Sequence, residues 1–259
     1  AEPARQFLLQ GGDFYWGAML HRNQQSTLHQ EVLDALRRDA HPEQTPDARL
    51  AASWASGQID AAQARGTTAA MHAHSFPAAV GVARNGDFTG VARLLDVAGG
   101  SGCFSIALAQ RHPNVRCTVM ELPEVGRVAE EYIARYGVTA QVETHAANMF
   151  ADPWPTGYDA VFFSNIFHDW DVARCRHLVA QSFAALPSGG RIYLHEILLA
   201  DSRDGPLPAA LFSLAMLIAN YGKQFTFGEL ESLLREGGFR DVGAAPTYGY
   251  YSLVSARKP

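Results

Sequence analysis

One histidine follows the end of an apolar run and is itself followed by acids. The run YDAVFF ends at Ser164, and His168 comes four residues later, before Asp169 and Asp171. An imidazole has an ordinary pKa of about 6.5 and is largely neutral at pH 7, so it suits removal of a proton from a substrate. The same pattern also fits a strand end with a surface loop, in which His168 begins a helix and Asp169 caps it.

A glycine-rich loop supplies a second candidate site. The segment LLDVAGGSG ends a predicted strand on Asp96 and continues through Gly99, Gly100 and Gly102. Glycines at such a turn let a ligand approach the backbone closely and permit left-handed conformations. The spacing is neither GxGxxG nor GxxxxGK[ST], so it matches neither the dinucleotide fingerprint nor a P-loop. An ordinary strand–helix turn is the simpler alternative.

A second acid stands at the end of the next predicted strand. The segment RCTVMEL places Glu121 there, where a carboxylate can accept hydrogen bonds from both hydroxyls of a ribose. A nucleoside bound without a pyrophosphate loop indicates S-adenosylmethionine. Methyl transfer from this cofactor is an in-line displacement at a sulfonium, so a protein chiefly aligns the acceptor and removes its proton.

These candidate residues lie on alternating strands and helices that begin at Arg93. This alternation is typical of a parallel sheet covered by helices on both faces. Thr226 and Glu229 form a capping-box pattern that predicts a helix start. The last two strands lie close together in the sequence and predict an antiparallel strand at one edge. The predicted strands are RLLDVA, RCTVMEL, AQVETHAA, YDAVFFSN, RIYLHEIL, RDVGAAPTYG and YYSLVSARKP.

The sequence before this alternation predicts helices without a clear strand. An alanine-rich stretch within it predicts two or three helices broken at Gly57, Gly66 and Pro77. We therefore expect a helical segment over residues 1–92, as a remnant of a dimerisation and substrate-lid region, and a catalytic domain over residues 93–259.

Composition argues against several other classes of protein. The chain has 259 residues, is 47% hydrophobic and carries a formal net charge of −5, which disfavours a nucleic-acid surface. No apolar run reaches the roughly 20 residues that span a bilayer, so we expect no membrane partner. Three cysteines without CxxC spacing suggest reduced thiols in a cytoplasmic protein. Ten histidines without an HExxH motif predict no metal site.

Six separated motifs resemble one known family. LLDVAGGSG, MELPEV, ANMF, NIFHDWD, LHEILL and GGF occur in the order found in S-adenosylmethionine-dependent O-methyltransferases related to plant caffeate and flavonoid enzymes and bacterial natural-product methyltransferases. The resemblance runs from about Trp16 onward. It implies a Rossmann-like class I methyltransferase fold, an α/β fold with a seven-stranded, mostly parallel sheet and an antiparallel edge strand. It also implies a homodimer, formed through an N-terminal domain expected to be largely absent from this chain.

The resemblance implies a set of cofactor contacts. Asn148 and Met149 match a pair beside the adenine, and Ser164 matches a position that is often lysine in plant members. Ala98 replaces the family's first loop glycine, so we expect a slightly different loop backbone. The expected cofactor-binding residues are Asp96, Gly99, Gly100, Gly102, Glu121, Leu122, Asn148, Met149, Phe150, Ser164 and Ser75.

The resemblance also implies the catalytic groups. His168 matches the family's base, and Glu196 matches an acid that supports it. A second supporting acid is usually glutamate, but Gln224 stands there, so one carboxylate rather than two is expected to orient the histidine. Aromatic and methionine side chains suit a flat, partly apolar acceptor. The residues expected to bind it are Met71, Trp16, Met19, Phe167, Met216, Asn220 and Tyr221.

We therefore expect a cytoplasmic, metal-independent enzyme that methylates a hydroxyl of a small aromatic or polyketide-like metabolite. The closest alternative is a C-methyltransferase, because a phenol ionised by His168 can attack through its ortho carbon. A Mg²⁺-dependent catechol-type enzyme is disfavoured because the sequence shows no evident cluster of metal-binding acids. A nicotinamide dehydrogenase is disfavoured by the glycine-rich loop and by the absence of a Ser-Tyr-Lys or similar hydride-transfer set. A catalytically degenerate cofactor-binding protein is disfavoured by the retention of His168 and Glu196.

Overall fold

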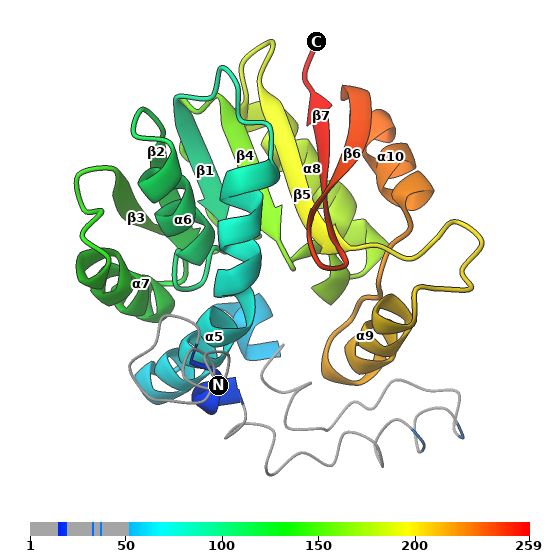
Figure 1. The fold of residues 1–259 in the computed structure, drawn as a ribbon, viewed down its shortest axis with the longest axis horizontal. Helices are drawn as coiled ribbons and strands as arrows, with labels where there is room; N and C mark the ends of the chain where they lie inside the picture. Colours follow the sequence, from blue (N-terminus) through cyan, green and yellow to red (C-terminus); the bar gives the residue numbers. More distant parts are fainter. Residues whose placement is uncertain (1–14, 20–32, 34–36, 38–51) are drawn as a thin grey trace.

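The part of the chain described by this computed structural model comprises residues 15–19, 33, 37 and 52–259. Within it, seven strands form one sheet in the order β3–β2–β1–β4–β5–β7–β6 (Figure 1). The strands are β1 (Arg93–Val97), β2 (Arg116–Glu121), β3 (Val142–Ala146), β4 (Ala160–Ser164), β5 (Arg191–Ile197), β6 (Arg240–Tyr248) and β7 (Tyr251–Arg257). The expected mostly parallel α/β fold is confirmed, because β1 to β5 run parallel.

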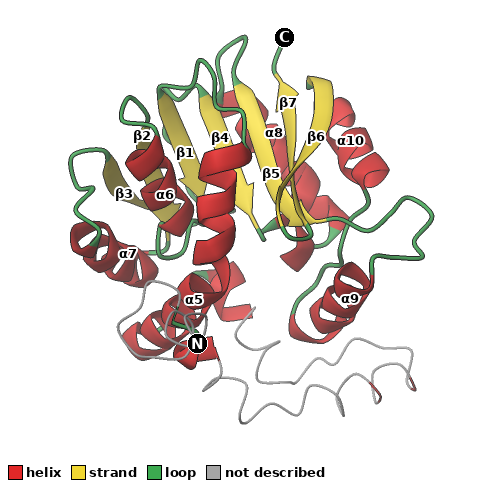
Figure 2. Cartoon of the chain, viewed as in Figure 1, coloured by secondary structure: helices red, strands yellow, loops and turns green. Residues whose placement is uncertain are grey.

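Helices cover both faces of this sheet (Figure 2). They are α5 (Ala61–Asn85), α6 (Cys103–Arg111), α7 (Pro123–Arg135), α8 (Val172–Ala185), α9 (Leu207–Ala219) and α10 (Phe227–Glu236), with a short 3₁₀ turn, η1 (Phe167–Asp169). The predicted capping box is present at the start of α10, where Thr226 and Glu229 satisfy each other's backbone amides.

Alternation along the central strands creates two separate cores. Phe162 and Tyr193 point to the face covered by α5, α6 and α7. Phe163 and Leu194 point to the opposite face and pack with residues of α8 and α10. Because side chains alternate along a strand, residues paired in register on neighbouring parallel strands share a face.

The strand order reverses between β1 and β4. β2 and β3 extend the sheet on one side of β1, and β4 with β5 extends it on the other. In an open α/β sheet, ligands bind outside the carboxyl ends of the strands at this point of reversal. The glycine-rich loop follows β1 and η1 follows β4, so both candidate segments lie at that edge.

The predicted antiparallel pairing at one edge of the sheet is present, and the strand that runs against the others, β7, lies one position inside that edge. β7 pairs antiparallel with both β5 and β6, which leaves β6 as the outermost strand. Burial explains this order, since β7 is mostly buried and β6 is mostly exposed. β6 also contains Pro246, which cannot donate to a neighbouring strand and is tolerated at an edge.

The predicted helix breaks at Gly66 and Pro77 are wrong, because α5 runs through both positions. Asp60 caps its first turn, and alanines with Phe76 and Val82 bury one side of it against the sheet. This packing outweighs the hydrogen bond that a proline removes from a helix. The break at Gly57 is present, with φ of 73°. The boundary at residue 92 stays a prediction, although the second half of α5 shares the sheet's core.

Candidate active site

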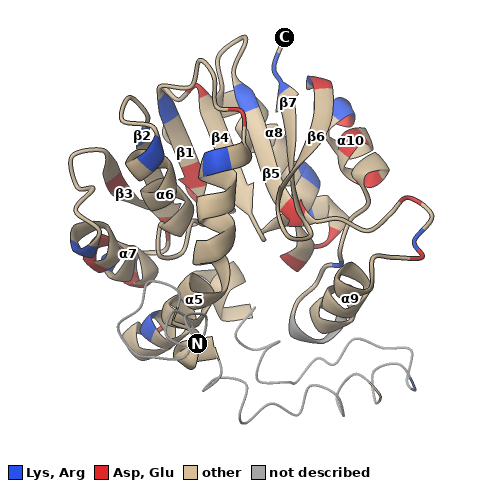
Figure 3. Cartoon of the chain, viewed as in Figure 1, with Lys and Arg blue, Asp and Glu red and all other residues tan. Residues whose placement is uncertain are grey.

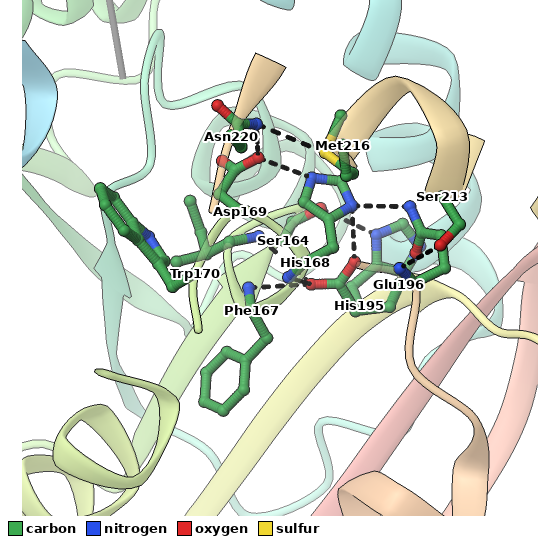
Figure 4. A network of polar contacts seen from close by, with 12 residues as sticks. Ser164, Phe167, His168, Asp169, Trp170, His195, Glu196, Ser213, Met216 and Asn220 are labelled. Carbon is green, nitrogen blue, oxygen red and sulfur yellow. Dashed lines mark hydrogen bonds and ion pairs between the residues drawn. The ribbon is translucent and has the colours of Figure 1, made fainter. Parts of the chain in front are cut away.

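His168 lies in η1, just beyond the carboxyl end of β4, and its side chain is buried. Its Nδ1 is 3.2 Å from Oε2 of Glu196 and 2.9 Å from Nε2 of Gln224 (Figure 4). Its Nε2 is 3.4 Å from Oδ1 of Asp169. The structure thus brings together the three residues expected to form the catalytic centre, from three separate parts of the chain.

Glu196 is held at the end of β5 by backbone amides. Its Oε1 accepts hydrogen bonds from the amides of Ile166, Phe167 and His168, at 3.2, 3.0 and 3.5 Å. These donors favour the carboxylate, but burial and the nearby Asp169 outweigh them and raise the pKa of Glu196 to about 8. Burial and the nearby His74 lower the pKa of His168 to about 3. Burial therefore disfavours a charge on either residue alone, and an imidazolium on His168 is stabilised when Glu196 beside it is a carboxylate.

The amide of Gln224 decides which nitrogen of His168 is free. If Nε2 of Gln224 donates to Nδ1 of His168, the ring proton lies on Nε2 and that nitrogen is no base. Oε1 of Gln224 is then buried without a hydrogen-bond partner among the described residues. Amide orientation is assigned from the surrounding hydrogen bonds. Turning the amide lets Oε1 and Glu196 both accept from Nδ1–H, which leaves Nε2 of His168 free to take a proton.

Asp169 stands on the open side of His168 and meets the end of α9. Nδ2 of Asn220 donates to Oδ1 of Asp169 and lies 3.3 Å from Sδ of Met216. The Asp169 side chain keeps 29% of its surface exposed, and the burial of the remainder raises its pKa, which favours the neutral acid. The expected pairing of Met216 with Asn220 therefore places both beside the histidine.

The glycine-rich loop wraps around the carboxylate of Glu121. The amide of Gly100 donates to Oε2 at 3.0 Å, and the amide of Leu122 donates to Oε1 at 2.8 Å. Gly100 has φ of 58°, and a Cβ there would meet nothing within 4 Å. Ala98 has φ of 53°, so it keeps the left-handed backbone that the family's glycine favours. The loop therefore differs less from a glycine turn than expected.

Asp96 packs against the buried side of this loop and does not face the proposed cofactor site. Its carboxyl group is almost completely buried and accepts a 2.6 Å hydrogen bond from Oγ of Ser105. A Cβ on Gly99 would lie 2.8 Å from that carboxyl group, so only glycine fits at position 99 without displacing Asp96. Burial raises the pKa of Asp96 and of Glu121 to about 7.

Three expected adenine-side residues form the turn after β3. Oδ1 of Asn148 accepts from the amide of Phe150 at 2.9 Å, and its Nδ2 donates to the carbonyl of Ala55 at 3.3 Å. Phe150 packs edge-on against Trp170 at 4.9 Å between ring centroids, and the carbonyl of Met149 accepts from Trp154. Oδ1 of Asn148 keeps one lone pair for a further donor.

The polar groups beside the glycine-rich loop fit an S-adenosyl nucleoside. The ribose of such a molecule carries two hydroxyl donors, and Glu121 offers a fixed carboxylate at the end of β2. Gly100 leaves space above the loop for close approach. Ser164, at the carboxyl end of β4, and Ser75, a buried residue of α5, are the candidates for the methionine end of the cofactor.

Two expected acceptor contacts are not supported by the structure. Phe167 is fully buried and packs edge-on against Phe163 in the core beneath η1, because the turn directs its ring inward. Tyr221 is 40% exposed and stacks on Trp170 under the guanidinium of Arg174, on the outer side of the turn.

One histidine near the site was missed from the sequence. His74 lies between Trp16 and Phe212, with ring centroids 6.1 and 6.2 Å away, and the ring of Phe212 meets His168 at 5.1 Å. Met71 lies three residues before His74 and is likewise half-buried, so both project from one side of α5. The three-residue spacing between Met71 and His74 is the sequence feature that could have indicated His74. The expected residue Met19 is also buried.

The described part of the chain carries neither a basic surface nor a cluster of metal ligands. Lys and Arg positions there are dispersed along the chain and interleaved with Asp and Glu positions (Figure 3). Within residues 15–19, 33, 37 and 52–259, no group of three or more His, Cys, Asp or Glu side chains could hold a metal ion. Over the same residues, no helix combines the length and apolarity needed to cross a bilayer.

Comparison with known sequences adds a family match. The O-methyltransferase domain family matches residues 32–240. The 3-hydroxy-5-methyl-1-naphthoate 3-O-methyltransferase of Streptomyces sahachiroi is 44% identical over 156 residues, which are 60% of this chain and 45% of that protein. The L-tyrosine C(3)-methyltransferase of Streptomyces lavendulae is 34% identical over 155 residues, 59% of this chain and 42% of that protein. The chain thus spans less than half the length of these relatives.

Comparison with solved structures agrees in fold. Human N-acetylserotonin methyltransferase, solved in complex with S-adenosylmethionine, superposes with a TM-score of 0.88 at 23% identity, over 100% of this chain and 74% of that one. The S-adenosylmethionine-dependent methyltransferase SibL, solved in its apo form, superposes with a TM-score of 0.76 at 30% identity, over 93% of this chain and 73% of that one.

Proposed function

This chain belongs to the O-methyltransferase domain family, and from that premise we propose that it transfers a methyl group from S-adenosylmethionine to a hydroxyl of a small aromatic or polyketide-like metabolite. The observation that carries this proposal is a juxtaposition at one edge of the sheet. Gly100 follows β1 and Glu121 ends β2, whereas His168 follows β4 and Glu196 lies near the carboxyl end of β5.

Two relatives support the cofactor and the acceptor class. SibL, at 30% identity, is named as an S-adenosylmethionine-dependent methyltransferase. The Streptomyces sahachiroi relative is named for methylation of a hydroxyl on a naphthoate. A flat hydroxylated ring also suits the half-buried side chains of Phe212, which lies beside His168, and of Trp16, which lies beside His74.

In the proposed mechanism, His168 removes the proton from the acceptor hydroxyl. Bound S-adenosylmethionine supplies an electrophilic methyl group. Nε2 of His168 takes the hydroxyl proton, while Nδ1–H is held by Glu196 and by the turned amide of Gln224. The Glu196 carboxylate stabilises the imidazolium that forms. A positioned base of this kind contributes about 10²–10⁴-fold to the rate.

C-methylation is the second candidate, and one relative supports it. The L-tyrosine C(3)-methyltransferase is 34% identical to this chain. A phenol ionised by His168 carries negative charge on its ortho carbon as well as on oxygen, so the same base serves both reactions. Alignment of the ring relative to the methyl group then decides which atom is methylated.

We also propose a cytoplasmic homodimer. The three cysteines are buried and unpaired, which supports a reducing compartment. Light scattering on the full-length protein measures the dimer directly, and a monomer at micromolar concentration contradicts it.

The proposed activity is tested with methyl-labelled S-adenosylmethionine and a panel of hydroxynaphthoates and simpler phenols. We expect label in at least one product, and NMR of that product separates a methoxy from an aryl-methyl signal. Binding of the cofactor without transfer to any member of the panel contradicts the proposed acceptor class.

A further inference from the structure

A second buried histidine lies next to the proposed cofactor site and takes no part in the mechanism above. His195 on β5 pairs in register with Ser164 on β4, so the two side chains share one face of the sheet. Nδ1 of His195 is 2.9 Å from Oγ of Ser164 (Figure 4). Nε2 of His195 is 3.0 Å from Oγ1 of Thr247, which itself lies 3.3 Å from the carbonyl of Tyr251.

The direction of every hydrogen bond in this chain follows from its last member. The carbonyl of Tyr251 can only accept, so the hydroxyl of Thr247 donates to it. Thr247 has one hydroxyl proton, and therefore Nε2–H of His195 donates to Oγ1 of Thr247. Nδ1 of a neutral imidazole is then an acceptor, and the hydroxyl of Ser164 donates to it.

Burial keeps His195 in this one neutral tautomer. Its ring is fully buried and stacks on Tyr251 at 4.7 Å between centroids, and the edge of Phe104 lies 5.2 Å away. Burial lowers the pKa of His195 to about 3, so Nδ1 stays unprotonated at neutral pH.

Ser164 is thereby left with lone pairs and no free proton at the carboxyl end of β4. Register places it on the same face as Asp96, because Asp96 pairs with Phe162 and Phe162 alternates with Ser164. That face carries α6 and the glycine-rich loop that begins it. Ser164 is half-buried, whereas His195 behind it is sealed.

We propose that His195 and Thr247 are positioning residues that fix Oγ of Ser164 as a pure hydrogen-bond acceptor for the ammonium group of the cofactor's methionine end. This inference rests on the proposed function. An ammonium group offers only donors, and a serine hydroxyl with a free proton could turn that proton toward it. The two residues behind Ser164 prevent that rotation without touching the cofactor.

The test compares two ligands that differ at that ammonium group. S-adenosylhomocysteine carries the amino acid end, and 5′-methylthioadenosine lacks it. We expect Ser164→Ala and Thr247→Val each to weaken S-adenosylhomocysteine about 10- to 100-fold by calorimetry, as for the loss of a hydrogen bond to a charged group. Affinity for 5′-methylthioadenosine should change less than about twofold, and Thr247→Ser should restore wild-type binding of both.

The tautomer of His195 is measured by NMR on protein labelled with nitrogen-15 in its histidines. We expect the proton on Nε2 in the wild type and in Thr247→Ser, and on Nδ1 in Thr247→Val. A wild-type proton on Nδ1, unchanged affinity in Ser164→Ala, or equal losses for both ligands overturns the inference. If the wild type binds neither ligand, the proposed function itself fails; if it binds both, only this inference is at stake.

Discussion

Gln224 lies 2.9 Å from Nδ1 of His168, the same ring nitrogen that Glu196 approaches to 3.2 Å. The histidine is therefore flanked by one carboxyl group and one neutral amide. A carboxylate beside an imidazole raises its pKa, whereas an amide oxygen fixes the tautomer without adding charge. This pairing sets the basicity of His168.

Replacing Gln224 with glutamate should move the acidic limb of the pH profile of kcat/KM to higher pH. The added carboxylate stabilises the imidazolium, so the base becomes protonated at a higher pH, by about one unit. Gln181→Glu adds the same charge on α8 and serves as the control. An acidic limb that stays in place in Gln224→Glu would show that this side chain does not govern the ionisation of His168.

Cofactor affinity should fall as the pH falls below about 7. Burial raises the pKa of Glu121 to about 7 in the free protein, and ribose hydroxyls bind the carboxylate rather than the acid. Binding then releases a proton, and affinity decreases by up to about tenfold per pH unit on the acidic side. Calorimetry with S-adenosylhomocysteine at several pH values measures this.

Glu121→Gln should weaken binding and remove most of this pH dependence. Glu124→Gln, on α7, should keep the wild-type profile. A pH dependence that survives in Glu121→Gln assigns the released proton to another group, with the buried Asp96 as the first alternative.

Ala98→Gly should stabilise the protein by about 1 kcal/mol. Ala98 has φ of 53°, where a Cβ is strained and glycine is not. The matched change Ala180→Gly, at an exposed position in α8, should instead destabilise by about 1 kcal/mol. Urea unfolding compares the two midpoints, and a loss of stability in Ala98→Gly contradicts the strain.

The order of motifs along the sequence predicted the sheet and the edge where the candidate site lies. Five of the six motifs stand at or just after the end of a strand, whereas GGF precedes β6. The carboxyl ends of parallel strands meet at one edge, so the approach of His168 to Glu196 followed from topology. Local patterns failed where distant packing decides the outcome. α5 continues through Pro77 because its side is buried against the sheet.

Contacts between distant segments could not be read from the sequence. The chain from Ser164 through His195 to Thr247 joins three strands that only the sheet order brings together. Phe167 belongs to an apolar run whose periodicity does not say which way a 3₁₀ turn points its ring. β7, rather than β6, pairs with β5, because β7 is the more buried strand of the hairpin. The sequence does not state that choice.

The central claim is that His168 removes the acceptor proton, and the rate of His168→Gln as a function of pH tests it most directly. At pH 7 and saturating acceptor, we expect the variant to lose about 10²–10⁴-fold in turnover and to keep wild-type affinity for S-adenosylhomocysteine. The deficit should shrink as the pH approaches about 10, where a phenol ionises without a base. Near-wild-type turnover at pH 7, or a deficit that stays constant up to pH 10, would contradict the account.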